Sequence, residues 1–198
     1  FMLTRIMHEA GLPNGVVNLI HGKGSGAGQF LVDSVDEGLV NKISFTGSTP
    51  VGKMIGEVCG RNLVSCSLEL GGKNPLVVMP SANIENAVEG AYWAAFGTAG
   101  QRCTSLGNLI LHKDIYEEFM DKFMAKVKET KIGDSLRNDD VLYGSMLSEK
   151  YASDFLRDLG MCETDGATKL WGEGRITNEN KPENFQGDAS EGSYMWPH

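Results

Sequence analysis

The sequence lacks two features that would place the protein in a membrane or outside the cell. None of its apolar runs approaches the roughly 20 residues that a membrane-spanning helix needs. Its first residues do not follow the order of basic, apolar and small residues that marks a secretory leader. These absences predict a cytoplasmic protein without a membrane partner.

Positive charge is also scarce. The chain of 198 residues carries 18 Lys and Arg against 26 Asp and Glu, which gives a net charge of -8. A surface of this sign repels nucleic acid and anionic lipid, so neither is expected as the main partner. Backbone N–H groups can still hold a compact anion such as a dinucleotide.

The four cysteines show neither CxxC pairs nor the spacing of Cys/His ligand sets. They are Cys59, Cys66, Cys103 and Cys162. We therefore expect no metal site. An even number of cysteines does not establish disulfides in a chain of this size, and reduced thiols are the simpler interpretation.

Short β-rich runs alternate with helical patterns, and this order predicts an α/β fold with a mostly parallel sheet. Strands are expected at residues 16–20, 42–45, 63–70, 76–79 and 106–112. Helices are expected near residues 1–10, 29–32, 49–60, 83–96, 114–127 and 148–160. The region from Gly172 to Ser193 is rich in Gly, Asn and Glu, and it is expected to form a long surface loop.

Caps and glycines predict where the helices begin and end. Expected starts are Ser48 or Thr49 with Pro50 in the first turn, Ser81 or Asn83, a capping box of Asp114 and Glu117, and Ser148. Gly60 and Gly160 are expected to end two of the helices. The four histidines have no recognisable partner, and we assign them no role.

Cys103 is the first candidate for chemistry. Most small thiols in α/β proteins are buried and inert. The sequence GTAGQRCTS around Cys103 is too small and polar for a core strand, and its glycines leave room for a ligand. We therefore interpret Cys103 as a reactive thiol in a loop. The alternative is a structural cysteine.

Glu69 is the second candidate. It shares its parity with Ser65 and Ser67 in a β-forming run, so it is either an exposed residue of an alternating strand or a functional carboxylate. In the second interpretation it lies at the carboxyl end of a strand, where α/β sheets carry their sites, and it acts as a general base in a partly apolar pocket.

Two glycine-containing segments are candidates for holding a nucleotide. GKGSGAG, at residues 22–28, lies between an expected strand and helix but matches the dinucleotide fingerprint only if alanine replaces its last glycine. FTGSTPVG places Ser48 at a helix start, where N–H groups can cradle a phosphate. A flexible turn and simple helix capping would also explain these residues.

FTGSTPVGK, LELGGKNP and GTAGQRCTS occur in this order, and together they resemble the aldehyde dehydrogenase superfamily. The similarity covers nearly the whole chain and fades after Gly174. It implies parallel-sheet segments from the end of a Rossmann-like cofactor domain, residues 1–69, and the start of a catalytic domain, residues 70–198.

The resemblance also implies roles for individual residues. Cys103 matches the nucleophile and Glu69 the general base. The residues that match the binding site for NAD or NADP are Gly24, Gly28, Gly47, Ser48 and Leu70. The substrate would be a small aldehyde, which Cys103 captures as a thiohemiacetal that becomes a thioester, and Glu69 activates the water that hydrolyses it.

The resemblance further implies a partial chain that lacks the N-terminal part and the C-terminal end of a full enzyme. The complete enzyme would be a homo-oligomer, a dimer or a tetramer, and this chain alone is expected to be inactive. Three alternatives stay open. They are a cysteine-dependent hydrolase or acyltransferase without a nucleotide, a non-catalytic relative kept for structure or assembly, and a variant that passes the thioester to coenzyme A.

Overall fold

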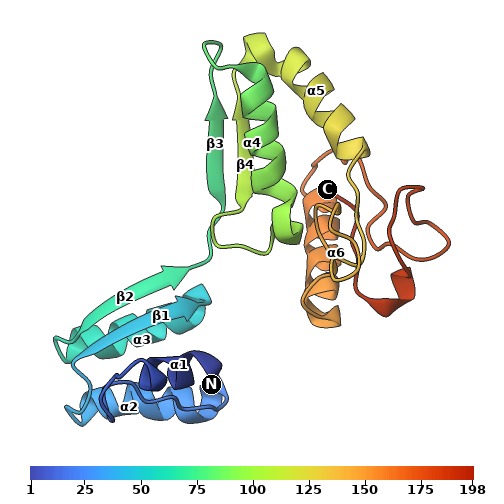
Figure 1. Cartoon of the computed structure of the whole chain (residues 1–198). Helices are drawn as coiled ribbons and strands as arrows, with labels where there is room; N and C mark the ends of the chain where they lie inside the picture. The colour runs from blue at the N-terminus through green and yellow to red at the C-terminus, as the bar shows by residue number, and fades with distance from the viewer. The chain divides into compact units, whose positions relative to one another are not determined.

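The computed structural model describes residues 1–198, which form two compact units, Phe1–Leu70 and Gly71–His198. Each unit contains one pair of parallel strands with helices beside it (Figure 1). Parallel neighbours cannot be joined by a tight turn, so a helix connects the strands within each pair. The α/β class that the sequence predicts is confirmed.

Unit 1, residues 1–70, is built around the β1–β2 pair. Its elements are α1 (Met2–Glu9), the π-helical turn η1 (Gly24–Gly28), α2 (Gln29–Asp36), β1 (Lys42–Gly47), α3 (Thr49–Arg61) and β2 (Ser65–Leu70). Its core is small: Val32, Ile55 and Cys59 are buried beneath half-buried side chains of the strands. The core therefore joins α2 and α3 to one face of the strand pair.

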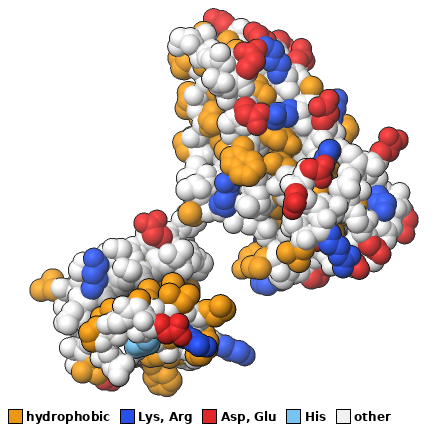
Figure 2. Space-filling view, viewed as in Figure 1, with side chains coloured by type: hydrophobic (Ala, Val, Ile, Leu, Met, Phe, Trp, Pro, Cys, Tyr) orange, Lys and Arg blue, Asp and Glu red, His pale blue; other side chains and the backbone are white.

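The strand predicted at residues 16–20 is not formed, so that prediction is wrong. The sheet of unit 1 contains β1 and β2 alone, and neither pairs with this segment. A β-rich run without a neighbouring strand has no partner for its backbone hydrogen bonds. Val16 and Ile20 are 61% and 63% exposed, and apolar side chains are conspicuous on the surface of unit 1 (Figure 2).

Unit 2, residues 71–198, is larger. Its elements are β3 (Asn74–Val78), α4 (Ile84–Phe96), η2 (Gly97–Gly100), β4 (Leu106–Leu111), η3 (Lys113–Ile115), α5 (Tyr116–Lys128), α6 (Glu149–Thr164) and η4 (Ala189–Glu191). In Figure 1, α4 runs beside the β3–β4 pair, and α4 also packs on α5. None of the helices in either unit combines the length and the apolar composition that crossing a bilayer requires.

The apolar stripes predicted for two helices of unit 2 are confirmed. On α4, Val88 and Tyr92 are buried, and on α5, Phe119, Phe123 and Val127 are buried in the same cluster. Phe119 has no exposed surface. These contacts hold both helices against the β3–β4 pair. The segment with Cys103 directly precedes β4.

A predicted side-chain cap forms at Asn83 but not at Ser48, Ser148 or Asp114, although Ser48 and Ser148 do stand directly before the first helical residues. Asn83 Oδ1 accepts a hydrogen bond from the Asn86 backbone N–H over 2.9 Å at the start of α4. The capping box predicted for Asp114 and Glu117 is not formed, because Asp114 lies inside η3. Its N–H instead donates to His112 Nδ1 over 3.3 Å, so a histidine supplies the cap.

The glycines predicted to end two helices lie inside them. Helix α3 continues through Gly60 to Arg61, and α6 continues through Gly160 to Thr164. An interior glycine costs a helix only about 1 kcal/mol, which the packing of a buried face can offset. Helix α6 ends where Gly166 adopts a left-handed φ of +91°.

The C-terminal region is irregular, as predicted for residues 172–193, but it is not a surface loop. Ile176 is 1% exposed and Phe185 is 8% exposed. Both belong to a second core cluster of unit 2, together with Tyr143 and Tyr194. The region therefore folds by burying separate apolar residues, without the periodic pattern of a helix or strand.

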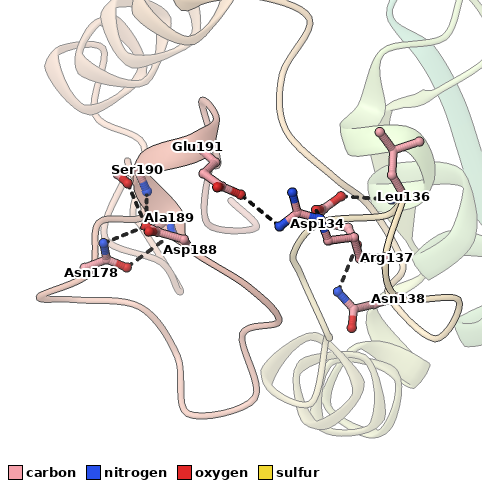
Figure 3. Close-up of polar contacts among 9 residues, drawn as sticks. All are labelled: Asp134, Leu136, Arg137, Asn138, Asn178, Asp188, Ala189, Ser190 and Glu191. Atoms are coloured by element: carbon pink, nitrogen blue, oxygen red, sulfur yellow. Dashed lines mark hydrogen bonds and ion pairs between the residues drawn. The ribbon is translucent and has the colours of Figure 1, made fainter.

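Polar contacts fasten this region to the segment before α6 (Figure 3). The Arg137 guanidinium pairs with Asp134 over 3.2 Å and with Glu191 over 3.3 Å. On the other side of η4, the Asp188 carboxylate accepts a hydrogen bond from Asn178 Nδ2 over 2.8 Å. The figure shows the pair of Arg137 and Glu191, which joins segments that are 54 positions apart in the sequence.

We expect Asp188→Ala to change how the stability of unit 2 depends on acid. Hydrogen bonds from Asn178 and Ser190 lower the pKa of Asp188 from 3.8 to about 2. Because the folded pKa is the lower one, the stabilisation is complete above about pH 4 and is lost as the pH falls through about 2. Asp188→Ala should therefore lower Tm at neutral pH, and the difference from the wild type should shrink between those two pH values.

The matched control is Asp139→Ala, because Asp139 is an exposed carboxylate without a hydrogen bond or ion pair. Thermal melts followed by circular dichroism across the acid range would measure both variants. Equal pH dependence of Tm in Asp188→Ala and the wild type would contradict the assignment.

Candidate functional site

Four of the candidate residues lie together at the carboxyl end of the β1–β2 pair. The parallel register sets Thr46 opposite Glu69 and Gly47 opposite Leu70. Ser48 follows Gly47 directly and precedes α3. Glu69 therefore lies at the carboxyl end of a strand, where parallel sheets carry their sites.

The start of α3 is open to an anion. Ser48 occupies the position before the first helical residue, Thr49, and its backbone is extended, with a φ of −77° and a ψ of 148°. Its hydroxyl makes no capping hydrogen bond. The first N–H groups of a helix have no acceptor within the helix, and its dipole favours negative charge. A phosphate can therefore bind at this end of α3.

Glu69 is exposed, as are Ser65 and Ser67 on the same face of β2, while Cys66 and Leu68 on the other face are half-buried. The alternating-strand interpretation is correct for its surroundings in unit 1. The carboxylate makes no ion pair or side-chain hydrogen bond there. Unit 1 alone does not enclose it in the apolar pocket that we expected.

Gly24 and Gly28 line a cavity of about 350 Å³ between α2, β1 and α3. Its walls are mostly apolar, with Val51 and Met54 from α3 on one side. Pockets for small molecules commonly measure about 300–1,000 Å³, so the space suits a group the size of a nucleoside. Two of the glycines assigned to nucleotide binding thus lie at a cavity in unit 1.

Cys103 lies in unit 2, in the segment that joins α4 to β4, residues 97–105, which we call the cysteine loop. The backbone φ angles of Thr98, Ala99 and Gly100 are +56°, +54° and +67°. Left-handed backbone costs a residue other than glycine about 1–2 kcal/mol. The loop is therefore a strained turn that its surroundings hold in place, a feature that clusters at functional sites.

The Cys103 side chain is exposed and makes no hydrogen bond, and the Cys103 backbone N–H has no acceptor. The neighbouring Arg102 is directed to α4. Its Nη2 donates to the Trp93 carbonyl over 3.0 Å, and its guanidinium carbon lies 5.5 Å from the centre of the Trp93 ring. Arg102 is thus anchored on α4, while the sulfur and the backbone N–H of Cys103 both remain available.

Two residues outside the loop, Asn74 and Leu147, hold it in place by hydrogen bonds. Asn74 Nδ2 donates to the carbonyls of Cys103, over 2.8 Å, and Ser105, over 2.9 Å. Gln101 Oε1 accepts a hydrogen bond from the Leu147 backbone N–H over 2.9 Å. Asn74 is not among the site residues that the sequence predicts. Its position between a glycine pair and a proline in LELGGKNP was the only available signal.

The first residues of β4 pack directly on the backbone that precedes β3. A Cβ atom at Gly107 would lie 2.7 Å from the Lys73 Cα. Asn108 Nδ2 donates to the Lys73 carbonyl over 3.2 Å. This close approach requires glycine at position 107.

We expect Gly107→Ala to destabilise unit 2 by about 1–3 kcal/mol, because its methyl group would force the two backbones apart. The matched control is Gly90→Ala in α4, where no atom lies within 4 Å of an added Cβ. That change should stabilise the helix by about 0.5–1 kcal/mol. Urea unfolding would measure both free energies of unfolding, and equal stability of Gly107→Ala and wild type would contradict the close approach.

A second cavity, of about 460 Å³, lies in unit 2 between α5, α6 and residues 167–174. Methionine, leucine and phenylalanine side chains form much of its lining. Cys103 is not among its lining residues, so the cavity does not serve the thiol.

Two curated relatives are similar to this chain. It is 39% identical over 170 residues to the alpha-ketoglutaric semialdehyde dehydrogenase of Bacillus subtilis (strain 168), covering 86% of this chain and 34% of the relative. It is 44% identical over 137 residues to the D-glyceraldehyde dehydrogenase (NADP(+)) of Picrophilus torridus, covering 69% of this chain and 27% of the relative. The chain thus spans about a third or less of the length of these relatives.

The crystal structure of PnpE in complex with nicotinamide adenine dinucleotide is similar in fold, with a TM-score of 0.85 at 37% sequence identity. The match covers 99% of this chain and 38% of that chain. The model of the aldehyde dehydrogenase family matches residues 1–187 of this chain. These residues include the strand pairs of both units and the cysteine loop. The chain therefore belongs to the aldehyde dehydrogenase family.

Proposed function

We propose that the protein to which this chain belongs oxidises an aldehyde to a carboxylic acid, with Cys103 as nucleophile, Glu69 as general base and NAD or NADP as oxidant. One observation carries the proposal. In a member of this family, an exposed thiol without a hydrogen bond occupies a strained loop whose carbonyls at Cys103 and Ser105 are held by Asn74. A structural cysteine would be expected in a packed core instead.

In the proposed reaction the Cys103 thiolate attacks the carbonyl carbon. A C–S bond forms, and the carbonyl oxygen becomes an alkoxide to which the unpaired Cys103 N–H can donate. A donor aimed at such an oxyanion is worth about 3–4 kcal/mol. Bound NAD(P)+ would be the oxidant, as the acceptor of the hydride from the substrate carbon, and Cys103 would then hold the substrate as a thioester.

Glu69 then accepts a proton from water, and the resulting hydroxide attacks the thioester carbon. The C–S bond breaks, the acid leaves and the Cys103 thiolate is restored. This role of Glu69 favours hydrolysis over transfer to coenzyme A. The proposal requires carboxylate 69 and sulfur 103 to act on one substrate in the working enzyme.

Residues of unit 1 are suited to hold the cofactor. Ser48 and the first turn of α3 can bind a phosphate next to Gly47, and the cavity lined by Gly24 and Gly28 can take a nucleoside. Leu70 would provide the backbone beside the nicotinamide. One relative is named for NADP(+) and PnpE was crystallised with nicotinamide adenine dinucleotide, which supports the class NAD(P) for this chain.

The proposal makes residues 1–69 part of the cofactor domain and residues 70–198 part of the catalytic domain of a homo-oligomeric enzyme. The chain spans 34% of the length of the Bacillus subtilis relative, and we expect it to be inactive by itself. An NAD(P)H signal that depends on aldehyde, from the purified 198-residue chain, would contradict this part of the proposal.

The nucleophile and the cofactor can be tested together by alkylating the chain with iodoacetamide in the presence and absence of NAD+ or NADP+. Peptide mass spectrometry resolves each thiol, and Cys162, which is also exposed, is the internal reference. We expect the cofactor to change the rate at Cys103 at least about threefold and to leave Cys162 unchanged. No binding and no effect at Cys103 would favour a thiol enzyme that uses no nucleotide.

A further inference from the structure

We propose that Asn74 is a positioning residue for Cys103: its carboxamide holds the carbonyls of Cys103 and Ser105 in the cysteine loop. The inference rests on the proposed role of Cys103 as nucleophile. Asn74 itself touches no reacting atom. It acts by fixing the backbone that carries the thiol.

The geometry determines how the carboxamide is oriented. Both partners of Asn74, the carbonyls of Cys103 and Ser105, can only accept hydrogen bonds, so the NH2 group must face them. The carboxamide oxygen lies on the side of Gly72, where an added Cβ would come within 3.4 Å of it. The two bonds measure 2.8 and 2.9 Å, which is ideal for N–H···O geometry.

The backbone of Asn74 is held rigidly by its strand pair. It is the first residue of β3 and pairs with Leu106, and the register shifts between Asn74 and Pro75. Pro75 cannot donate to the strand ladder, which accounts for an irregularity at this point. The close approach of Gly107 to Lys73 then locks this end of β3 onto β4. Because its backbone is fixed in this way, the Asn74 side chain can hold the strained cysteine loop in place.

The two bonds control the electrostatic surroundings of the thiol. A carbonyl oxygen carries the negative end of its dipole, and it would destabilise a thiolate if it turned toward the sulfur. While both carbonyls are held by Asn74, neither can do so. Removing the carboxamide frees them, and a carboxylate in its place repels them. Thiolate formation at Cys103 should then require a higher pH.

The test uses Asn74→Ser, Asn74→Ala and Asn74→Asp in the 198-residue chain. Serine keeps one donor, alanine keeps none, and aspartate keeps the shape but offers only acceptors. The matched control is Asn108→Ala, which removes a carboxamide bond to the Lys73 carbonyl from the same strand pair without touching the cysteine loop. The readout is the pH profile of iodoacetamide alkylation, resolved for Cys103 and Cys162, with Tm measured alongside.

Near neutral pH we expect the Cys103 rate to fall about threefold in Asn74→Ser and about tenfold in Asn74→Ala, with a larger fall in Asn74→Asp. The profile should move to higher pH and keep its plateau within about twofold. Cys162, and Cys103 in Asn108→Ala, should stay within about twofold of the wild type even if Tm falls. A merely structural role would lower Tm without moving the profile.

The inference is overturned if the Cys103 profile is unchanged in the Asn74 variants, or if Asn108→Ala moves it equally. If Asn74→Asp fails to fold, the Cys103 profile of Asn74→Ser tests the inference instead, because serine keeps one hydrogen-bond donor. Failure of the proposed function looks different: NAD(P)+ would then have no effect at wild-type Cys103, while the dependence on Asn74 would persist.

Discussion

Replacing Cys103 by alanine is expected to lower aldehyde oxidation by at least about 10³-fold, because removing a covalent nucleophile leaves only binding and oxyanion stabilisation. The measurement needs a complete enzyme. The 170 residues of this chain that match the Bacillus subtilis relative, at 39% identity, can replace the corresponding segment of that enzyme. The rate of NAD(P)H formation in this chimera, with and without the substitution, gives the effect.

The control for this experiment is Cys162→Ala, which removes the other exposed thiol of unit 2. It should leave kcat within about twofold of the chimera, since surface substitutions away from a site have small effects. Substantial activity in Cys103→Ala, or an equal loss in Cys162→Ala, would contradict the role of Cys103.

Replacing Glu69 by glutamine is expected to separate the two halves of the reaction. Cys103 can still capture the aldehyde and form the thioester, but no carboxylate remains to take the proton from water. The chimera should release one equivalent of NAD(P)H in a burst and then turn over about 10²–10⁴-fold more slowly than before. Stopped-flow fluorescence of NAD(P)H would show both phases.

The control here is Glu57→Gln, which neutralises an exposed glutamate of α3 in the same unit and should leave both phases unchanged. If Glu69→Gln lost the burst itself, Glu69 would act before the thioester forms. Unchanged steady-state turnover would remove Glu69 from the mechanism.

Local patterns predicted the parts of the fold that local interactions form. The stripes of α4 and α5 are confirmed because each repeats with the helical period and buries one face, as Tyr92 and Phe119 do. The cap at Asn83 depends on a residue only three positions away. All the residues that form such a stripe or cap lie within a short stretch of sequence, so the sequence alone reveals them.

The predictions that failed depended on distant partners. Residues 16–20 have the composition of a strand, but no neighbouring strand pairs with them in unit 1. Ile176 and Phe185 stand alone among polar residues, and only the folded chain brings them together with Tyr143. Composition could not reveal that they are buried.

In the candidate site, too, features set by the local sequence could be predicted and features set by distant partners could not. The small residues around Cys103 and the strand end at Glu69 could be read from the sequence, and the structure gives both an exposed position. Asn74 could not be found in this way, because its bond to Cys103 spans 29 positions. The direction of Arg102 depends equally on a tertiary contact, with Trp93.

The central claim is that sulfur 103 holds the substrate as a thioester that carboxylate 69 helps to hydrolyse. Peptide mass spectrometry of the Glu69→Gln chimera, quenched in acid after one turnover with aldehyde and NAD(P)+, tests it most directly. We expect the mass of the acyl group on the peptide that carries Cys103 and on no other cysteine. A burst of NAD(P)H without an acyl group on Cys103, or with one on Cys162, would contradict the account.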